Sequence, residues 1–157
     1  MADTLFQMIV DSLALGEIAT QGGEEYPSEA CGVLVVEGDS LVSIPFENIQ
    51  DKLHAIDPER YTRTSLTAYN MNTLKLVRMQ ARQDLRVIYH THVECGAYFS
   101  DEDQQCALTP DGSAPVMPGI DYLVVSIYDR KARAANLYRF DEGTHQYELV
   151  DGVELGG

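Results

Sequence analysis

The stretch from Val87 to Asp103 limits most strongly what this chain can fold into. Its opening apolar run ends in two histidines, His90 and His92. After seven intervening residues, Ser100 and Asp103 form a Ser-x-x-Asp. Residues i and i+2 of a strand project from the same face, so both imidazoles can point into one site. Ser100 has the features of a helix N-cap followed by an acid-rich first turn. We therefore expect a helix to start here and to bring one carboxylate back to the two histidines.

Two imidazoles and one carboxylate are a possible metal-ligand set. Zinc sites with three protein ligands keep the fourth position for water, which is the catalytic arrangement. Each half of the pattern has an ordinary explanation, because a His-x-His at a strand end commonly binds no metal and a Ser-x-x-Asp is commonly a variant of the capping box. The combination at this spacing is what indicates a metal site.

The four-part pattern resembles the signature of the JAMM (MPN-plus) metalloproteases. That signature contains His-x-His, seven residues and Ser-x-x-Asp, as at His90–Asp103 here. The family also carries an upstream glutamate in a Glu-x-x-Gly-hydrophobic context, which Glu29, Gly32 and Val33 match. The resemblance spans roughly residues 5–140. One departure is Val93, because the family often has proline directly after the second histidine.

The resemblance implies a zinc ion held by His90, His92 and Asp103, with a bound water. It implies that Glu29 acts as general base for that water and that the Ser100 hydroxyl donates to the oxyanion. The implied reaction is hydrolysis of the peptide or isopeptide bond after the C-terminal Gly-Gly of ubiquitin, a ubiquitin-like protein or a bacterial sulfur carrier. Neither the carrier nor the leaving amine is specified, and the oligomeric state stays open.

Composition narrows the class of protein further. A chain of 157 residues is long enough for one domain and buries roughly 70% of its unfolded surface. Its net charge of −14 disfavours nucleic acid as a partner, and no apolar run approaches the ~20 residues of a membrane span. The first residues lack the basic start of a signal peptide, and the three cysteines show no CxxC spacing. We therefore expect a cytoplasmic protein without a disulfide framework.

We expect a single domain over residues 1–157 with an α/β fold of the α+β type. The resemblance implies a mixed, mostly antiparallel central sheet flanked by helices, in a cytidine-deaminase-like arrangement. The apolar pattern predicts helices over 4–20 (ended by Gly22-Gly23), over 66–83 and from Ser100, with a further helix start at Asp57-Pro58. Strands are predicted over 32–36, 41–46, 85–90, 122–128, 134–140 and 146–150.

Two further features concern the surface of this fold. Residues 109–119 are predicted to form an irregular loop beside the site, and residues 151–157 a flexible tail. The predicted helix over 66–83 has an apolar face formed by Leu66, Met71, Leu74, Val77 and Ala81.

Three other functions compete with the metalloprotease. His92-Val93-Glu94 is the His-x-Glu of zinc deaminases, but their Pro-Cys-x-x-Cys is missing. Cys95 could serve as the nucleophile of a thiol hydrolase, although a loop cysteine without a mechanistic role is the simpler interpretation. A non-catalytic scaffold domain is the third, and such relatives typically lack some metal ligands.

Asn48 is a candidate for positioning the substrate backbone, although a structural role in a turn is the simpler interpretation.

Overall fold

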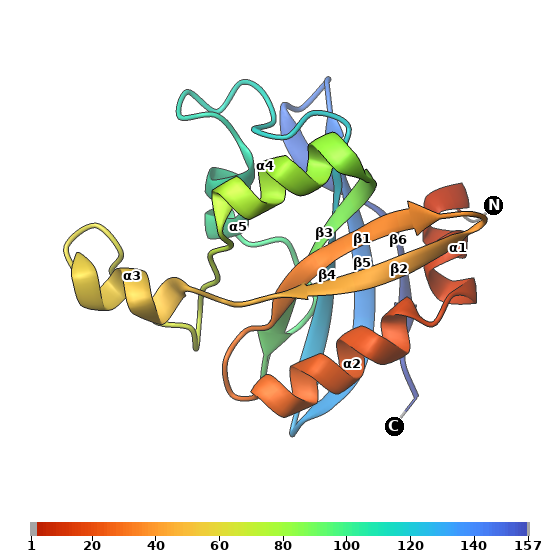
Figure 1. Ribbon diagram of the computed structural model, residues 1–157, viewed down its shortest axis with the longest axis horizontal. Helices are drawn as coiled ribbons and strands as arrows, with labels where there is room; N and C mark the ends of the chain where they lie inside the picture. The colour runs from red at the N-terminus through yellow and green to blue at the C-terminus, as the bar shows by residue number, and fades with distance from the viewer. Residues whose placement is uncertain (1–2, 157) are drawn as a thin grey trace.

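The computed structural model describes residues 3–156 as one six-stranded sheet with helices on both faces (Figure 1). The helices are α1 (Thr4–Asp11), α2 (Ala14–Glu25), α3 (Gln50–Ile56), α4 (Thr73–Arg82) and α5 (Asp101–Ala107). The strands are β1 (Cys31–Glu37), β2 (Ser40–Phe46), β3 (Asp84–Val93), β4 (Asp121–Tyr128), β5 (Lys131–Asp141) and β6 (Gln146–Glu154). Within these residues, no helix is both long and apolar enough to cross a membrane.

The sheet is mixed and mostly antiparallel, which confirms the predicted fold class. Its strand order is β2-β1-β3-β4-β5-β6. The pair β3–β4 is parallel, and the other four neighbouring pairs are antiparallel. The helix α5 lies in the crossover between β3 and β4, as a parallel pair requires a long connection. This crossover places the start of α5 beyond the end of β3 that carries the histidines.

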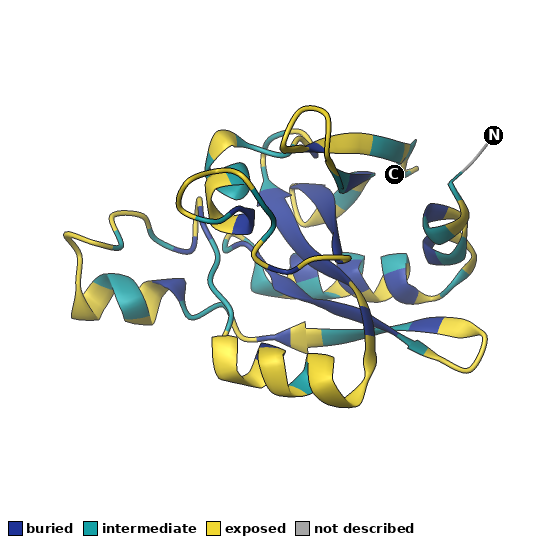
Figure 2. Cartoon of the chain, turned by 90° about the horizontal axis from the view of Figure 1, so that it is seen from above, coloured by how far each residue is buried: buried dark blue, intermediate teal, exposed yellow. Residues whose placement is uncertain are grey.

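The central strands are buried along most of their length (Figure 2). Two separate apolar clusters pack against the two faces of the sheet. Val87 and Tyr89 of β3 belong to the cluster beneath α1 and α2, which we call the helix face. Ile88 belongs to the cluster beneath α4, α5 and the 109–119 loop, which we call the site face. Alternation along β3 therefore puts His90 and His92 on the site face.

The predicted helix over 4–20 is two helices. The break falls at Ser12, whose hydroxyl accepts a hydrogen bond from the Ala14 backbone N at 3.1 Å. The second helix does not end at Gly22-Gly23 but continues to Glu25, so that stop signal was wrong. Gly22 serves packing instead: a Cβ there would lie 2.9 Å from Ile127 Cδ1 on β4, so the glycine lets α2 approach the sheet closely.

The predictions for residues 57–83 also need correction. Asp57 is the C-cap of α3 and does not start a helix. The next helix, α4, begins after its N-cap Asn72, whose side chain accepts from Lys75 N at 2.9 Å. Its buried residue is Leu76, whereas Leu74 and Val77 of the predicted apolar face are exposed. Residues 66–72 are non-helical because they are held by contacts from other segments, described below.

The end of the chain is more ordered than expected. Strand β6 extends to Glu154, which pairs with Ala134, so residues 151–154 do not form a flexible tail. Leu155 N also donates to Arg133 O at 2.8 Å, and Gly157 lies outside the described residues. Residues 109–119 contain no helix or longer strand, as predicted, and a single bridge between Leu108 and Pro115 closes the loop.

Candidate active site

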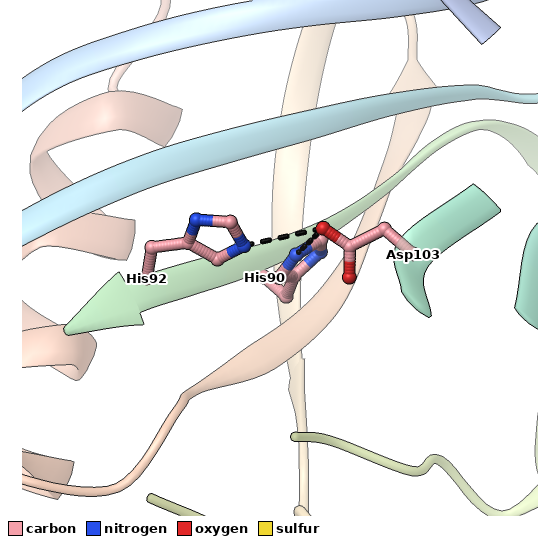
Figure 3. Close-up of side chains that lie close together, drawn as sticks. All are labelled: His90, His92 and Asp103. Atoms are coloured by element: carbon pink, nitrogen blue, oxygen red, sulfur yellow. Dashed lines mark hydrogen bonds and ion pairs between the residues drawn. The ribbon is translucent and has the colours of Figure 1, made fainter. Parts of the chain in front are cut away.

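Three side chains from two elements converge at the end of β3. His90 and His92 come from β3, and Asp103 comes from the first turn of α5 (Figure 3). The Nε2 atoms of both histidines lie 3.2 Å from one oxygen, Asp103 Oδ2. Their possible ligand atoms all lie within 4.8 Å of one another, so the group could hold a metal ion.

The capping box of α5 holds Asp103 in this position. Ser100 N donates to Asp103 Oδ2 at 3.0 Å, and Asp103 N donates to Ser100 Oγ at 3.0 Å. The two interpretations of the Ser-x-x-Asp motif are therefore compatible, because the oxygen that caps the helix also faces the histidines. The capping box at the start of α5 is therefore enough to orient the Asp103 carboxylate as a possible metal ligand.

His92 is oriented through its other ring nitrogen. Its Nδ1 donates to the carbonyl oxygen of Gly96, 2.9 Å away, which can only accept. Nε2 faces Asp103 Oδ2, to which it donates when protonated, and it would offer its lone pair to a metal ion when neutral. Burial lowers the pKa of His92, but hydrogen bonding to Asp103 and the nearby charge of that carboxylate raise it above the ordinary value.

His90 is fully buried, and its ring stacks on Tyr69 with centroids 4.4 Å apart. Burial lowers its pKa, which favours the neutral imidazole. Within residues 3–156, its Nδ1 has no hydrogen-bond partner. The stacked tyrosine therefore fixes the ring plane, and Nε2 points toward Asp103.

The donor chemistry fits a zinc ion. Burial alone would raise the pKa of Asp103, but the two imidazoles and the Ser100 backbone N hold it far below its usual range. The carboxylate is thus ionised beside two imidazole nitrogens, which is the N and O ligand set that zinc accepts. A cation between these three atoms would satisfy all of them at once.

Glu29 lies beside this group, directly before β1. The segment is tied to β3 because Ala30 N donates to Thr91 Oγ1 at 2.8 Å and Thr91 N donates to Ala30 O at 2.9 Å. Glu29 is only 6% exposed and lines a cavity of about 140 Å³ together with His92, Ser100 and Asp103. Burial raises the pKa of Glu29 to about 8, against the effect of the His92 charge, so its carboxyl can exchange a proton near neutral pH.

Asn48 supports Glu29 through the backbone. Its Nδ2 donates to the Glu29 carbonyl at 2.8 Å and to the Ala68 carbonyl at 3.1 Å. Its Oδ1 accepts from Gln50 N at 3.0 Å and from Asn70 N at 3.1 Å. These four hydrogen bonds join the segments around residues 29, 48 and 68–70, so Asn48 has a structural role and ties the non-helical segment 68–70 to the start of β1.

Several residues of the cavity were not identified from the sequence. Arg63, Leu66, Thr67 and Tyr98 line it, and no local motif marks them because loops bring them in. The 109–119 loop does not line it, contrary to the expectation of a loop beside the site.

The structure also bears on the competing functions. Glu94 is turned toward α2, where it accepts from Tyr26 Oη at 3.3 Å and from Asp129 N at 3.1 Å. It does not line the cavity and is poorly placed to act as the glutamate of a deaminase. Cys95 does line the cavity, but burial raises the pKa of its thiol, which disfavours the nucleophilic thiolate. Cys31 is fully buried in the site-face cluster, as expected for a core residue.

Comparisons with known proteins give a consistent result. Residues 12–138 match a family model described as prokaryotic homologs of the JAB domain. Similar curated proteins are named CysO-cysteine peptidase and come from Mycobacterium bovis and Mycobacterium tuberculosis. Each is 26% identical over 156 residues, which cover 96% of this chain and 94% of the relative.

Two solved structures resemble the fold. They are solution structures of proteins from Salinibacter ruber and Desulfitobacterium hafniense, both with a TM-score of 0.55 and 18% sequence identity. The matches cover 87% and 86% of this chain, respectively, and 84% of each of those chains. At this identity they support the fold alone.

Proposed function

Since this chain belongs to the family of prokaryotic homologs of the JAB domain, we propose that it is a zinc-dependent peptidase. Its substrate would be a sulfur-carrier or ubiquitin-like protein, cleaved at the amide bond that follows a C-terminal Gly-Gly. The observation that carries the proposal is the convergence of His90, His92 and Asp103 beside the buried Glu29. The name of the curated relatives favours a sulfur carrier joined to cysteine among these substrates.

His90, His92 and Asp103 would hold the zinc ion through Nε2, Nε2 and a carboxylate oxygen. When bound, the ion would supply a Lewis acid and a water whose pKa is lowered toward ~7. The capping box and the Gly96 carbonyl keep two of these ligands in position before any ion binds. Such preorganisation reduces the cost of assembling the site.

Glu29 would move the protons. Its carboxyl shares one small cavity with the metal ligands, and its raised pKa suits a group that takes a proton from water and passes it to the leaving amine. Positioned acid–base groups of this kind contribute about 10²- to 10⁴-fold to the rate. The Glu29 backbone is held at both of its polar groups, because Asn48 Nδ2 donates to its carbonyl and its N–H donates to the Ser65 carbonyl.

Ser100 would stabilise the oxyanion of the tetrahedral intermediate. Its Oγ already accepts from Asp103 N, so its own proton remains to be donated into the cavity that it lines. Loss of one such donor typically costs about 3 kcal/mol of barrier. No covalent intermediate is needed in this scheme.

The carrier tail must be narrow where it reaches the site. The cavity of about 140 Å³ is smaller than the roughly 300–1,000 Å³ of ordinary small-molecule pockets. Two glycines allow the backbone of a tail to approach closely without side-chain clashes. This requirement supports a Gly-Gly terminus on the acyl side of the bond.

The test is to incubate the zinc-loaded protein with Gly-Gly-tailed carriers joined to cysteine or to a lysine side chain, and to identify the released amine by mass. We expect release of the amino acid and recovery of a carrier that ends in Gly-Gly. Removing zinc with a chelator should stop the release, and adding zinc back should restore it. If the zinc-loaded protein cleaves none of these conjugates, the proposed function is wrong.

A further inference from the structure

We propose that Arg63 binds the free α-carboxylate of the amino acid that leaves. The site would then favour conjugates whose leaving group is one C-terminal amino acid over those joined through a lysine side chain. This inference rests on the proposed function and specifies its substrate class. Its basis is the position and pairing of one cation in an otherwise acidic cavity.

Arg63 is the one lysine or arginine among the described residues that line the Glu29 cavity. The carboxyl groups of that cavity belong to Glu29 and Asp103. Just outside, Glu102 forms an ion pair with Arg63, with 2.7 Å between Oε2 and Nε. The whole chain carries a net charge of −14, so a cation here stands out from its surroundings.

The chemistry of the leaving group makes this cation relevant. In a conjugate to a C-terminal amino acid, the scissile nitrogen and the α-carboxylate are attached to the same carbon. The carboxylate must therefore enter the small cavity together with the scissile bond. Asp103 would be bound to the zinc ion, but an ionised Glu29 would repel the incoming carboxylate, and the nearby guanidinium would offer it a cationic partner. A lysine isopeptide carries no charge at that position.

The Arg63 guanidinium has hydrogen-bond donors that its ion pair does not use. Its ion pair with Glu102 uses Nε, and within residues 3–156 neither Nη1 nor Nη2 donates a hydrogen bond. A planar guanidinium can offer two parallel N–H groups to a carboxylate, which is the geometry of bidentate recognition. The side chain is 52% exposed, so it can turn toward the cavity without breaking a packed core.

The backbone around Arg63 is fixed relative to Glu29. Gln50, which is buried, donates from Nε2 to the Arg63 carbonyl at 2.8 Å. Two residues on, the Ser65 carbonyl accepts from Glu29 N at 2.8 Å. Asp51 further anchors Ser65 through its N–H and hydroxyl, both at 2.7 Å. The cation and the proposed base therefore belong to one hydrogen-bonded frame, as a substrate-binding residue requires.

The experiment compares two conjugates that differ at one group. Both are Gly-Gly-tailed carriers joined to cysteine, one with a free α-carboxylate and one with an α-carboxamide. For the zinc-loaded wild-type protein we expect kcat/KM to be about 10- to 100-fold higher for the free acid, the range typical of hydrogen bonds to a charged group. In Arg63→Ala this ratio should fall to about 1, whereas Arg63→Lys should keep part of it.

Two variants serve as controls. Arg60→Ala removes a cation of the same segment that does not line the Glu29 cavity, so it should keep the wild-type acid-to-amide ratio. Glu102→Gln frees the Arg63 guanidinium and should lower KM for the free acid. Thermal unfolding of each variant tells whether the fold is intact.

The outcomes separate the two proposals. If the wild-type protein cleaves neither conjugate, the proposed function itself fails. If it cleaves both with equal kcat/KM, the function stands and the role of Arg63 is wrong, even where Arg63→Ala does not fold. A ratio that Arg63→Ala leaves unchanged, or that Arg60→Ala abolishes equally, also overturns the inference.

Discussion

The two faces of the sheet use the same strands for different purposes. On the helix face, β3 contributes Val87 and Tyr89 to a closed apolar cluster with α1 and α2. The one hydroxyl of that pair, Tyr89 Oη, is satisfied by Gln21. On the site face, the next residues of the same strand are Ile88, His90 and His92, and the cluster there is interrupted by ionisable groups.

The difference lies in how completely polar groups are satisfied. Two buried side-chain atoms of the described residues lack a partner, His90 Nδ1 and Tyr147 Oη, and both residues lie on the site face. Glu29 is also buried there, and this burial disfavours its ionised form, which raises its pKa. Both faces contribute an apolar core, but the site face also buries polar and ionisable groups that are not fully compensated, which costs stability.

The largest expected effect is a loss of kcat from a substitution on the site face. Glu29→Gln keeps the size of the side chain and removes the proton acceptor. We expect zinc content to stay at the wild-type value while kcat falls by about 10²- to 10⁴-fold. Steady-state hydrolysis of a carrier–cysteine conjugate, with zinc measured on the same sample, checks both. Glu94→Gln is the matched control and should retain activity, because Glu94 faces α2. Undiminished turnover in Glu29→Gln would remove Glu29 from its role.

The second effect belongs to the helix face. Ile18→Ala truncates a fully buried side chain of α2 and should cost about 2–5 kcal/mol of unfolding free energy. Denaturant unfolding measures this loss, and Leu13→Ala, at a residue 82% exposed, should change stability by only about 0.5 kcal/mol or less. Below the unfolding transition, kcat and zinc content of Ile18→Ala should match the wild type. A large loss of kcat in the folded variant would break the division between the faces.

The smallest effect concerns an ion pair at the start of α1, between its N-cap Asp3 and Arg139. The hydrogen bonds from Arg139 lower the pKa of Asp3, so its ionised form stabilises the fold. That contribution is present above the unfolded-state pKa of about 3.9 and is lost as the pH falls through the lower folded-state pKa. Asp3→Asn keeps the capping oxygen of α1 and should cost about 1 kcal/mol at pH 7.

Thermal unfolding of wild type and Asp3→Asn from pH 7 to pH 3 tests the sign of this effect. The difference between the two midpoints should shrink once the pH falls below about 4. A difference that grows toward low pH would mean that the Asp3 charge does not stabilise the fold.

Local patterns were sufficient to predict much of this molecule. The strand that ends in His90 and His92 and the capping box of Ser100 depend on residues near in sequence, and both form as predicted. The resemblance directed attention to Glu29, which the structure places in the same cavity. The roles of these residues stay predictions.

Non-local contacts explain what the sequence did not reveal. Gly22-Gly23 has the composition of a helix stop, but the need for close approach to Ile127 decides its conformation. The apolar residues of 66–72 have helical spacing, yet the segment is not helical, and Ala68 O and Asn70 N form hydrogen bonds with Asn48 instead. Arg63 reaches the cavity through a loop anchored by Gln50, and no periodic pattern marks such a residue.

We propose that His90, His92 and Asp103 hold one zinc ion on the site face. Native mass spectrometry of the folded protein, after addition of zinc and removal of the excess, measures this directly. We expect one zinc per chain in the wild type and in Ile18→Ala, and none in His90→Ala. A folded wild-type protein that retains no zinc, or a His90→Ala variant that retains one as tightly, would contradict it.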